Sequence, residues 1–282
     1  DPMVPGTSIV ETGVEGRLLR AYGTFSHPNS FGGYLFFVCM AFVALYVHHV
    51  KEFSKKNKTI LSIVGVIIFY SLFFTFSRSA WLAFLILFGC VSFYAVKNKN
   101  ETLKNFCFSV LILLAIVTVA YRGYIFDRFT LQNKHEQTSI SERVSGYEES
   151  IGLFKQRPLF GAGAGNYTFA SYTSDPDRAA FQYQPVHNVV LLFLVEWGVL
   201  GAALLGVVKI CYWLTFKEYL KKNKSVAAVL ILSIAPLALF DHYLLSSYVG
   251  LILMGIFAGL FTRYISTIHP PFVHNRQKIG LK

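Results

Sequence analysis

Charged residues are scarce in this chain of 282 residues, because Lys, Arg, Asp and Glu together make up only 15%. An ordinary soluble domain has about 25% charged residues. Hydrophobic residues make up 54% of the chain and aromatic residues 16%. This composition argues against a soluble globular domain and favours an integral membrane protein.

Acidic residues are fewer than basic ones, with 15 Asp and Glu against 26 Lys and Arg and a formal net charge of +11. In a soluble protein such an excess would suggest a nucleic-acid partner. Here the lysines gather in short loops between apolar runs, which is the pattern of membrane topology. We therefore expect no nucleic-acid partner.

Motifs for metals and disulfides are also missing. The chain has no HExxH sequence, no carboxylate cluster, and no CxxC or Cys/His spacing. All four cysteines lie in or at the edge of apolar runs, where they read as small buried apolar residues. They are Cys39, Cys90, Cys107 and Cys211. We expect neither a metal nor a cofactor.

The beginning of the chain lacks the basic and apolar regions of a signal peptide. It starts Asp1-Pro2-Met3, and we expect a fragment whose earlier membrane spans are missing. We find no internal repeat and no low-complexity segment.

Long apolar runs are what the chain has in abundance. A bilayer core needs about 20 helical residues, and seven runs approach or exceed that length. They cover residues 31–50, 59–76, 80–96, 105–121, 187–216, 226–240 and 247–265. We predict an all-α integral membrane protein, a polytopic bundle of about seven transmembrane helices with a large extracytoplasmic loop.

The basic residues predict the orientation of these spans. The loops at 51–58, 97–104 and 217–224 and the C-terminal tail are rich in Lys and Arg. They alternate correctly with seven spans, so all of them can share the cytoplasmic side. The loop at 122–186 is charge-balanced and falls on the opposite side, as do Arg20, Arg78 and His187.

The topology divides the chain into five parts. They are an extracytoplasmic polar segment (1–29), four transmembrane helices (30–121), an extracytoplasmic loop (122–186), three transmembrane helices (187–265) and a cytoplasmic tail (266–282).

The long loop carries signs of a helix. Ser139-Ile-Ser-Glu142 has the form of a capping box, and the apolar residues that follow it fall at helical spacing. Pro158 cannot continue a helix. We predict an amphipathic helix over 140–156 that lies on the outer membrane surface or over the bundle.

Three glycines follow in L-F-G-A-G-A-G-N, at 161, 163 and 165. They allow a tight backbone course, and such a loop can cap a cavity between spans. The stretch is weak evidence for phosphate binding because it has neither a Walker lysine nor a preceding strand.

The polar pair His187-Asn188 stands where this loop gives way to an apolar run. An imidazole at the mouth of a membrane helix is placed for acid–base chemistry, although a helix-capping or interfacial histidine is the simpler reading.

Glu196 lies nine residues further on, about 13 Å along a helix and on its opposite face, so a direct dyad with His187 is not expected. A carboxylate inside a span suggests function, but a tie to a neighbouring helix explains it equally well. Gly198 and Gly201 read as packing positions.

Arginines at the outer side are the candidate anion ligands. Arg78 stands between two spans, where it is either a snorkelling anchor or a cation that grips a diphosphate in bidentate fashion. Arg143 lies in the first turn of the predicted loop helix, where a positive charge opposes the helix dipole, unless it pairs with a nearby glutamate. Arg20 opens a polar motif before the first span. Asp241-His242 is either a second acid–base pair or a turn.

Four motifs, in order, resemble the O-antigen ligase and polymerase superfamily. They are R-A-Y-G-T-F-S-H-P-N before a span, T-F-S-R-S-A-W-L-A between two spans, S-E-R with R-P-L-F-G-A-G-A-G-N-Y in a large loop, and H-N followed by two glycines in the next span. The resemblance covers residues 20–201. In ligases the last motif often continues with two threonines. Here Ala202-Ala203 follow, which weakens a ligase assignment relative to a polymerase.

The resemblance implies a metal-independent, inverting glycosyltransferase in the bacterial cytoplasmic membrane, acting on the extracytoplasmic face in cell-envelope biogenesis. Its donor would be a glycan on undecaprenyl diphosphate, and its acceptor a glycan, a lipid or a wall polymer. Family roles carry over to His187 as the base that activates the acceptor hydroxyl, and to Arg78, Arg143 and Arg20 as diphosphate contacts. The transition state needs positive charge at the leaving group and a base at the acceptor, which these residues supply.

Two other classes stay open from the sequence. A transporter would place charged or broken helices at the bilayer midplane, where only Glu196 clearly qualifies. A non-catalytic scaffold of a surface-polymer assembly would need none of these side chains for chemistry.

Overall fold

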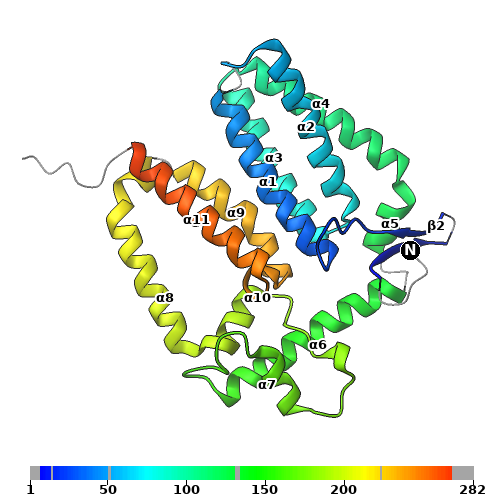
Figure 1. Cartoon of the computed structure of the whole chain (residues 1–282), viewed down its shortest axis with the longest axis vertical. Helices are drawn as coiled ribbons and strands as arrows, with labels where there is room; N and C mark the ends of the chain where they lie inside the picture. The colour runs from blue at the N-terminus through cyan, green and yellow to red at the C-terminus, as the bar shows by residue number, and fades with distance from the viewer. Residues whose placement is uncertain (1–6, 14, 50–51, 131–133, 223, 269–282) are drawn as a thin grey trace, which may run out of the picture.

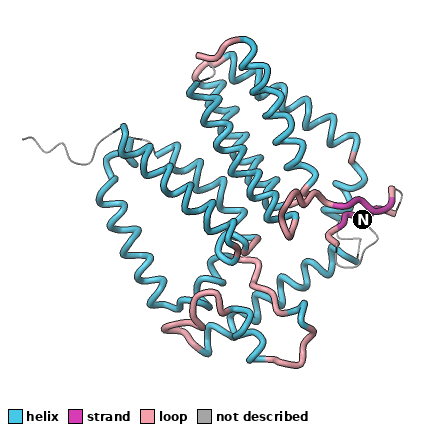
Figure 2. Tube along the Cα trace, viewed as in Figure 1, coloured by secondary structure: helices cyan, strands magenta, loops and turns pink. Residues whose placement is uncertain are grey.

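The computed structural model describes residues 7–13, 15–49, 52–130, 134–222 and 224–268 (Figure 1). Helices make up 77% of the structure, and Figure 2 shows one short hairpin beside them. The prediction of an all-α membrane protein is confirmed. Most of the predicted tail, from residue 269 on, lies outside the described residues.

Each of the seven predicted runs forms a long helix. These are α1 (Pro28–His49), α2 (Lys55–Phe74), α3 (Arg78–Lys97), α4 (Glu101–Ala120), α8 (Val189–Lys222), α9 (Lys224–Phe240) and α11 (Tyr248–Ile268). Among the described residues, α1, α2, α3, α4 and α8 are long and apolar enough to cross a membrane, and α9 and α11 contain shorter apolar stretches. Large apolar side chains such as Ile67, Phe108 and Leu204 stay exposed. Lipid accommodates such a surface, whereas water does not.

Side-chain caps explain where several of these helices begin. Ser54 accepts a hydrogen bond from the amide of Asn57 at the start of α2. Ser77 does the same for Ala80 at the start of α3. Each satisfies an amide that has no partner within its helix. Ser77 thereby starts a new helix shortly after α2 ends.

The core of the bundle joins α1, α2, α3 and α9. Phe36, Leu72, Ala80 and Leu237 come from these four helices and belong to one buried cluster. Helix α3 packs most extensively against α9. This pairing brings the beginning of α3 and the end of α9 to the same end of the bundle.

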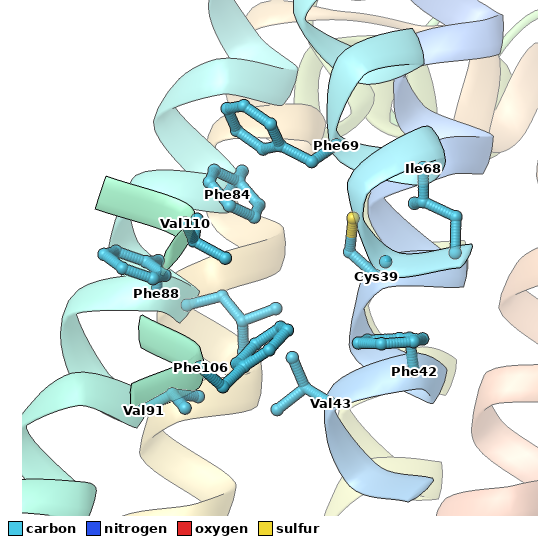
Figure 3. A pocket seen from close by; sticks show the side chains of 12 residues that line it. Cys39, Phe42, Val43, Ile68, Phe69, Phe84, Phe88, Val91, Phe106 and Val110 are labelled. Atoms are coloured by element: carbon cyan, nitrogen blue, oxygen red, sulfur yellow. The ribbon is translucent and has the colours of Figure 1, made fainter. Parts of the chain in front are cut away.

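A small apolar cavity lies between α1, α2, α3 and α4 (Figure 3). Its volume is about 30 Å³, and its walls include Phe42, Phe69, Phe88 and Phe106. None of the lining side chains is charged. The cavity is therefore a packing gap in the apolar core and not a reaction site.

The polar parts of the chain gather toward the lower and right side of Figure 1, away from the α1–α2, α3–α4 and α8–α9 connections. They are the hairpin β1 (Ile9–Thr12) and β2 (Gly16–Leu19), α5 (Arg122–Thr130), α6 (Lys134–Gln156), α7 (Tyr167–Ser174), the 3₁₀ turn η1 (Ala180–Gln182) and α10 (Tyr243–Ser246). The hairpin is antiparallel, with Ile9 opposite Leu19. The long loop is thus folded over one end of the bundle.

The loop helix begins earlier than predicted. Helix α6 starts at Lys134, not at residue 140. Ser139 therefore lies inside the helix, and the predicted capping box is wrong. Glu136 stands in the first turn instead, where a negative charge favours the helix dipole. The predicted C-terminal end at 156 is confirmed.

Helix α8 is broken at Gly198, whose φ of 64° and ψ of −169° are not helical. The break leaves carbonyl groups before it and amides after it without helical partners. The glycine-rich loop supplies them: Ala162 and Gly163 donate to the carbonyls of Val195 and Glu196 at 2.8 and 2.9 Å, and Val199 donates to Pro158 at 2.8 Å. The loop and the break therefore form one structural unit.

Candidate functional site

His187 lies at the entrance of α8, two residues before the helix begins at Val189. Asn188 caps that helix, because its side-chain oxygen accepts hydrogen bonds from Val190 and Leu191 at 2.9 and 3.0 Å. The Asn188 amide group also donates to the carbonyl of Leu239 at 3.1 Å. Asn188 thus joins the start of α8 to the end of α9 and fixes the position of its neighbour His187.

Asp241 is the acidic partner of His187. Nδ1 of His187 lies 3.5 Å from Oδ1 of Asp241, and the side chain of His187 is 22% exposed whereas that of Asp241 is 3% exposed. Ser79, at the start of α3, donates to the other carboxylate oxygen at 3.2 Å. The close packing of α3 on α9 makes this contact possible. From the sequence alone, Asp241 could have either an acid–base role or a place in a turn.

The charge of Asp241 is stabilised where it lies. Burial alone would raise its pKa, but contact with His187 and the nearby charges of His242 and Arg143 lower it. Asp241 is therefore ionised at neutral pH. Nδ1 of His187 meets this carboxylate at ion-pair distance without forming a hydrogen bond.

His242 completes what we call the histidine cluster: His187, Asp241 and His242. The two imidazole rings meet edge to face with centroids 4.9 Å apart, and Nδ1 of His242 lies 2.6 Å from the hydroxyl of Ser246. Burial, followed by the charge of His187, lowers the pKa of His242 to about 4, so His242 is neutral at pH 7. The possible ligand atoms of the cluster lie within 4.8 Å of one another, so among the described residues these three form a group that could hold a metal ion.

Arg20 is buried beside the α2–α3 connection. Its Nε donates to the carbonyl of Thr75 at 2.7 Å, and its Nη2 donates to Asn29 at 2.5 Å. Burial, followed by repulsion from Arg128, lowers the pKa of Arg20 to about 9. Arg20 therefore remains charged at neutral pH. The R-A-Y motif thus places its arginine at the same end of the bundle as Arg78.

Arg78 and Arg128 share one carboxylate, that of Glu136. Arg128 pairs with Oε1 of Glu136, and Nη1 of Arg78 lies 3.1 Å from Oε2. Both Arg128 and Glu136 are buried, with exposures of 7% and 4%. Nη2 of Arg78 is buried without a hydrogen-bond partner. Oε2 of Glu136 likewise has no hydrogen-bond partner, so Arg78 and Glu136 form an ion pair without a hydrogen bond.

Backbone carbonyls also position these arginines. Arg128 donates from Nε to Phe76 at 3.2 Å, and Arg78 donates to the carbonyl of Arg128 at 3.3 Å. Phe76 is fully buried and has a φ of 47°, which is uncommon for a residue other than glycine and is typical of functional sites. The short α2–α3 connection therefore presents carbonyls to arginines from two distant segments.

Arg143 is close enough to both groups of residues for its charge to act on each, on Asp241 and on Arg78. It is half-buried on α6. Seven residues separate it from Glu136, so both face the bundle from one side of the helix. We call Arg20, Arg78, Arg128 and Arg143 the arginine cluster.

Glu196 is not part of either cluster. It is buried in α8 beside the glycine-rich loop, and its backbone carbonyl accepts a hydrogen bond from Gly163 at 2.9 Å. Gly198 is the break in α8 rather than a position for helix packing, and a Cβ atom there would overlap the carbonyl of Leu159. A Cβ atom at Gly201 would meet the side chain of Trp197 at 2.5 Å.

Two residues of the site, Arg128 and Glu136, are not predicted from the sequence. Arg128 follows Tyr124 by four residues, and both are buried on one face of α5, so helical spacing was a usable signal for Arg128. No local signal marks Glu136, because its partner Arg78 is far away in the chain. Ser79 was likewise visible only as part of a polar turn.

Comparison with known proteins gives one match. A family model described as O-antigen ligase matches residues 63–206, just over half of the chain. The chain belongs to the O-antigen ligase family. Searches of curated proteins and of solved structures gave no match.

The O-antigen ligase family implies a multi-pass membrane protein with a glycan ligase- or polymerase-type activity, using a lipid-linked glycan donor and a glycan acceptor. The matched range contains Arg78, Arg128, Glu136, Arg143 and His187. The remaining residues of the two clusters lie outside that range. The fold brings both sets to one end of the bundle.

Proposed function

We propose that this protein transfers or polymerises a glycan carried on undecaprenyl diphosphate, at the extracytoplasmic face of the bacterial cytoplasmic membrane. The proposal rests on one observation, the proximity of a candidate base to a candidate diphosphate-binding site. His187 with its carboxylate partner Asp241 is a base, and the arginine cluster beside it is a site for a diphosphate. Arg143 acts on both.

The proposed reaction is a single displacement at the anomeric carbon of the donor sugar. The acceptor hydroxyl oxygen forms the new glycosidic bond, while the bond from the anomeric carbon to the diphosphate oxygen breaks. The hydroxyl proton passes to Nε2 of His187, and Asp241 stabilises the imidazolium that forms. The leaving diphosphate keeps the bonding electrons, and attack from the opposite face inverts the anomeric configuration.

The arginines supply the electrostatic stabilisation. A guanidinium fork matches two diphosphate oxygens, and charge that is fixed before the reaction needs no rearrangement during it. The backbone carbonyls that hold Arg20, Arg78 and Arg128 support such a role. Because a diphosphate is already a good leaving group, we propose that the transfer is metal-independent.

We favour a polymerase over a ligase, because Ala202-Ala203 stand where ligases often have two threonines. The test is reconstitution of the purified protein with a polyprenyl-diphosphate oligosaccharide. A ladder of products identifies a polymerase, and one transfer to an added acceptor identifies a ligase. Addition of a chelator should leave turnover unchanged. Uptake of the oligosaccharide into proteoliposomes without transfer would contradict the proposal and indicate a transporter.

A further inference from the structure

The carboxylate of Glu136 occupies a position that suits a phosphate group. It lies between the guanidinium groups of Arg78 and Arg128, with one oxygen directed to each. Carboxylate and phosphate oxygens accept the same bidentate hydrogen bonds from arginine. Glu136 therefore satisfies these arginines in the way that a bound anion would.

The site does not depend on Glu136 for its geometry. Arg128 is held by the carbonyl of Phe76, and Arg78 by the carbonyl of Arg128. These two contacts come from the α2–α3 connection and from α5, not from α6. When Glu136 moves away, both guanidinium groups keep an anchor.

Glu136 also leaves the site incompletely satisfied. Nη2 of Arg78 is buried without a partner, and Oε2 of Glu136 makes only an ion-pair contact there rather than a well-formed hydrogen bond. A buried donor without an acceptor is unfavourable, because it has lost its hydrogen bonds to water. A diphosphate brings more oxygens and more negative charge than one carboxylate, so it suits the cluster better.

Helix α6 connects this position to the rest of the loop. Glu136 lies in its first turn, whereas the other half of the helix is fixed by separate contacts. Ser150 lies 2.9 Å from the hydroxyl of Tyr167, and Glu149 pairs with Arg178 at 2.5 Å. The first turn can therefore leave the arginines while the second half of α6 stays attached.

We propose that Glu136 is an internal counter-anion that occupies the diphosphate position between Arg78 and Arg128, and that a diphosphate displaces it and releases the first turn of α6. This rests on the proposed function, and it adds Arg128 to the residues that contact the diphosphate. Before a donor binds, Glu136 keeps the two arginines paired. After the diphosphate leaves, Glu136 returns to its position between the two arginines.

The first test is the binding of inorganic diphosphate and of undecaprenyl diphosphate to the purified full chain, by calorimetry. If Glu136 occupies the arginines about nine-tenths of the time, Glu136→Gln should bind both ligands about tenfold more tightly. Glu142→Gln is the matched control, since Glu142 is an exposed glutamate of the same helix, and its affinity should equal that of the wild type. Unchanged or weaker binding by Glu136→Gln would show that Glu136 is only a structural clip.

The second test uses the wild-type protein and does not depend on the folding of a variant. At saturating diphosphate, amide hydrogen exchange should become faster in residues 134–140 and stay constant in residues 147–156. Slower or unchanged exchange in 134–140 would overturn the proposal, as would the absence of diphosphate binding. An effect of undecaprenyl diphosphate alone would assign the site to the lipid-linked form, and an equal effect of both would assign it to the diphosphate group itself.

The outcomes separate this proposal from the proposed function. Glycan transfer together with unchanged affinity in Glu136→Gln would overturn the role of Glu136 only. Release of α6 by diphosphate without any glycan transfer would overturn the proposed function only.

Discussion

Asp241 places a negative charge beside Nδ1 of His187, which an amide cannot reproduce. We expect Asp241→Asn to lower the rate of transfer on the order of 100-fold, which lies within the usual contribution of acid–base catalysis. The acidic limb of the pH–rate profile should also move to lower pH, because a protonated imidazole loses its neighbouring negative charge.

The measurement is the initial rate of transfer between pH 5 and pH 9. Asp177→Asn is the control, since Asp177 is an exposed carboxylate of the 122–186 loop. A loss of rate without a shift of the profile would indicate a purely structural role for Asp241.

Arg78 and Arg143 should bind the donor through the shape of guanidinium as well as through its charge. We expect Arg78→Lys and Arg143→Lys to raise the donor KM by roughly tenfold, because a hydrogen bond to a charged group contributes about 1.5–3 kcal/mol and an ammonium group cannot form the bidentate fork. Steady-state kinetics with varied donor concentration provide the test, with the exposed Arg122 changed to Lys as control. Wild-type KM values in both variants would refute diphosphate binding by these residues.

At the scale of the elements, the break in α8 and the glycine-rich loop depend on each other. Gly198→Ala puts a side chain at a φ of 64° and against the carbonyl of Leu159. A residue other than glycine in such a conformation costs about 1–3 kcal/mol, and the overlap adds to it. We expect a clear fall in the thermal unfolding temperature.

The control for this substitution lies in the same helix. A Cβ atom at Gly206 meets nothing within 4 Å, so Gly206→Ala should be neutral or stabilise α8 by up to about 1 kcal/mol. Equal unfolding temperatures for Gly198→Ala and Gly206→Ala would show that the loop does not rely on the break.

The seven long helices could be predicted from the sequence, whereas the break in α8 and the early start of α6 could not. Seven apolar runs gave seven helices, since burial in lipid demands complete internal hydrogen bonding of the backbone. Gly198 lies in an apolar run with nothing local to mark a positive φ. Its conformation depends on amides and carbonyls at residues 158–163. Glu136, in the first turn of α6, likewise pairs with Arg78, which is far away in the chain, and with Arg128.

The site residues follow the same rule: local motifs could be recognised in the sequence, but contacts between distant segments could not. His187, Arg20, Arg78 and Arg143 were found because ordered motifs and predicted topology placed them at one end of the bundle. The pairing of His187 with Asp241 requires the end of α9 to meet the start of α8, a contact between segments that are more than 50 residues apart in the chain. Helical phase could exclude Glu196 as a partner, but it could not find Asp241.

At the scale of the whole molecule, we propose that the basic connections between helices determine the orientation of the protein in the membrane. The basic connections lie at the end of the bundle opposite the two clusters (Figure 1), and the positive-inside rule places those connections in the cytoplasm. In a cysteine-free background, Asn57→Cys in the α1–α2 region should react with a membrane-impermeant maleimide only after the cells are opened. Asp177→Cys should react in intact cells, because both positions are exposed. The reverse pattern would place the clusters in the cytoplasm.

The most direct test of the central claim is the transfer rate of purified His187→Ala with a polyprenyl-diphosphate oligosaccharide. The account predicts that transfer is lost while the unfolding temperature and the affinity for inorganic diphosphate stay near those of the wild type, since the arginine cluster does not include His187. Turnover close to that of the wild type would contradict the claim that His187 is the base.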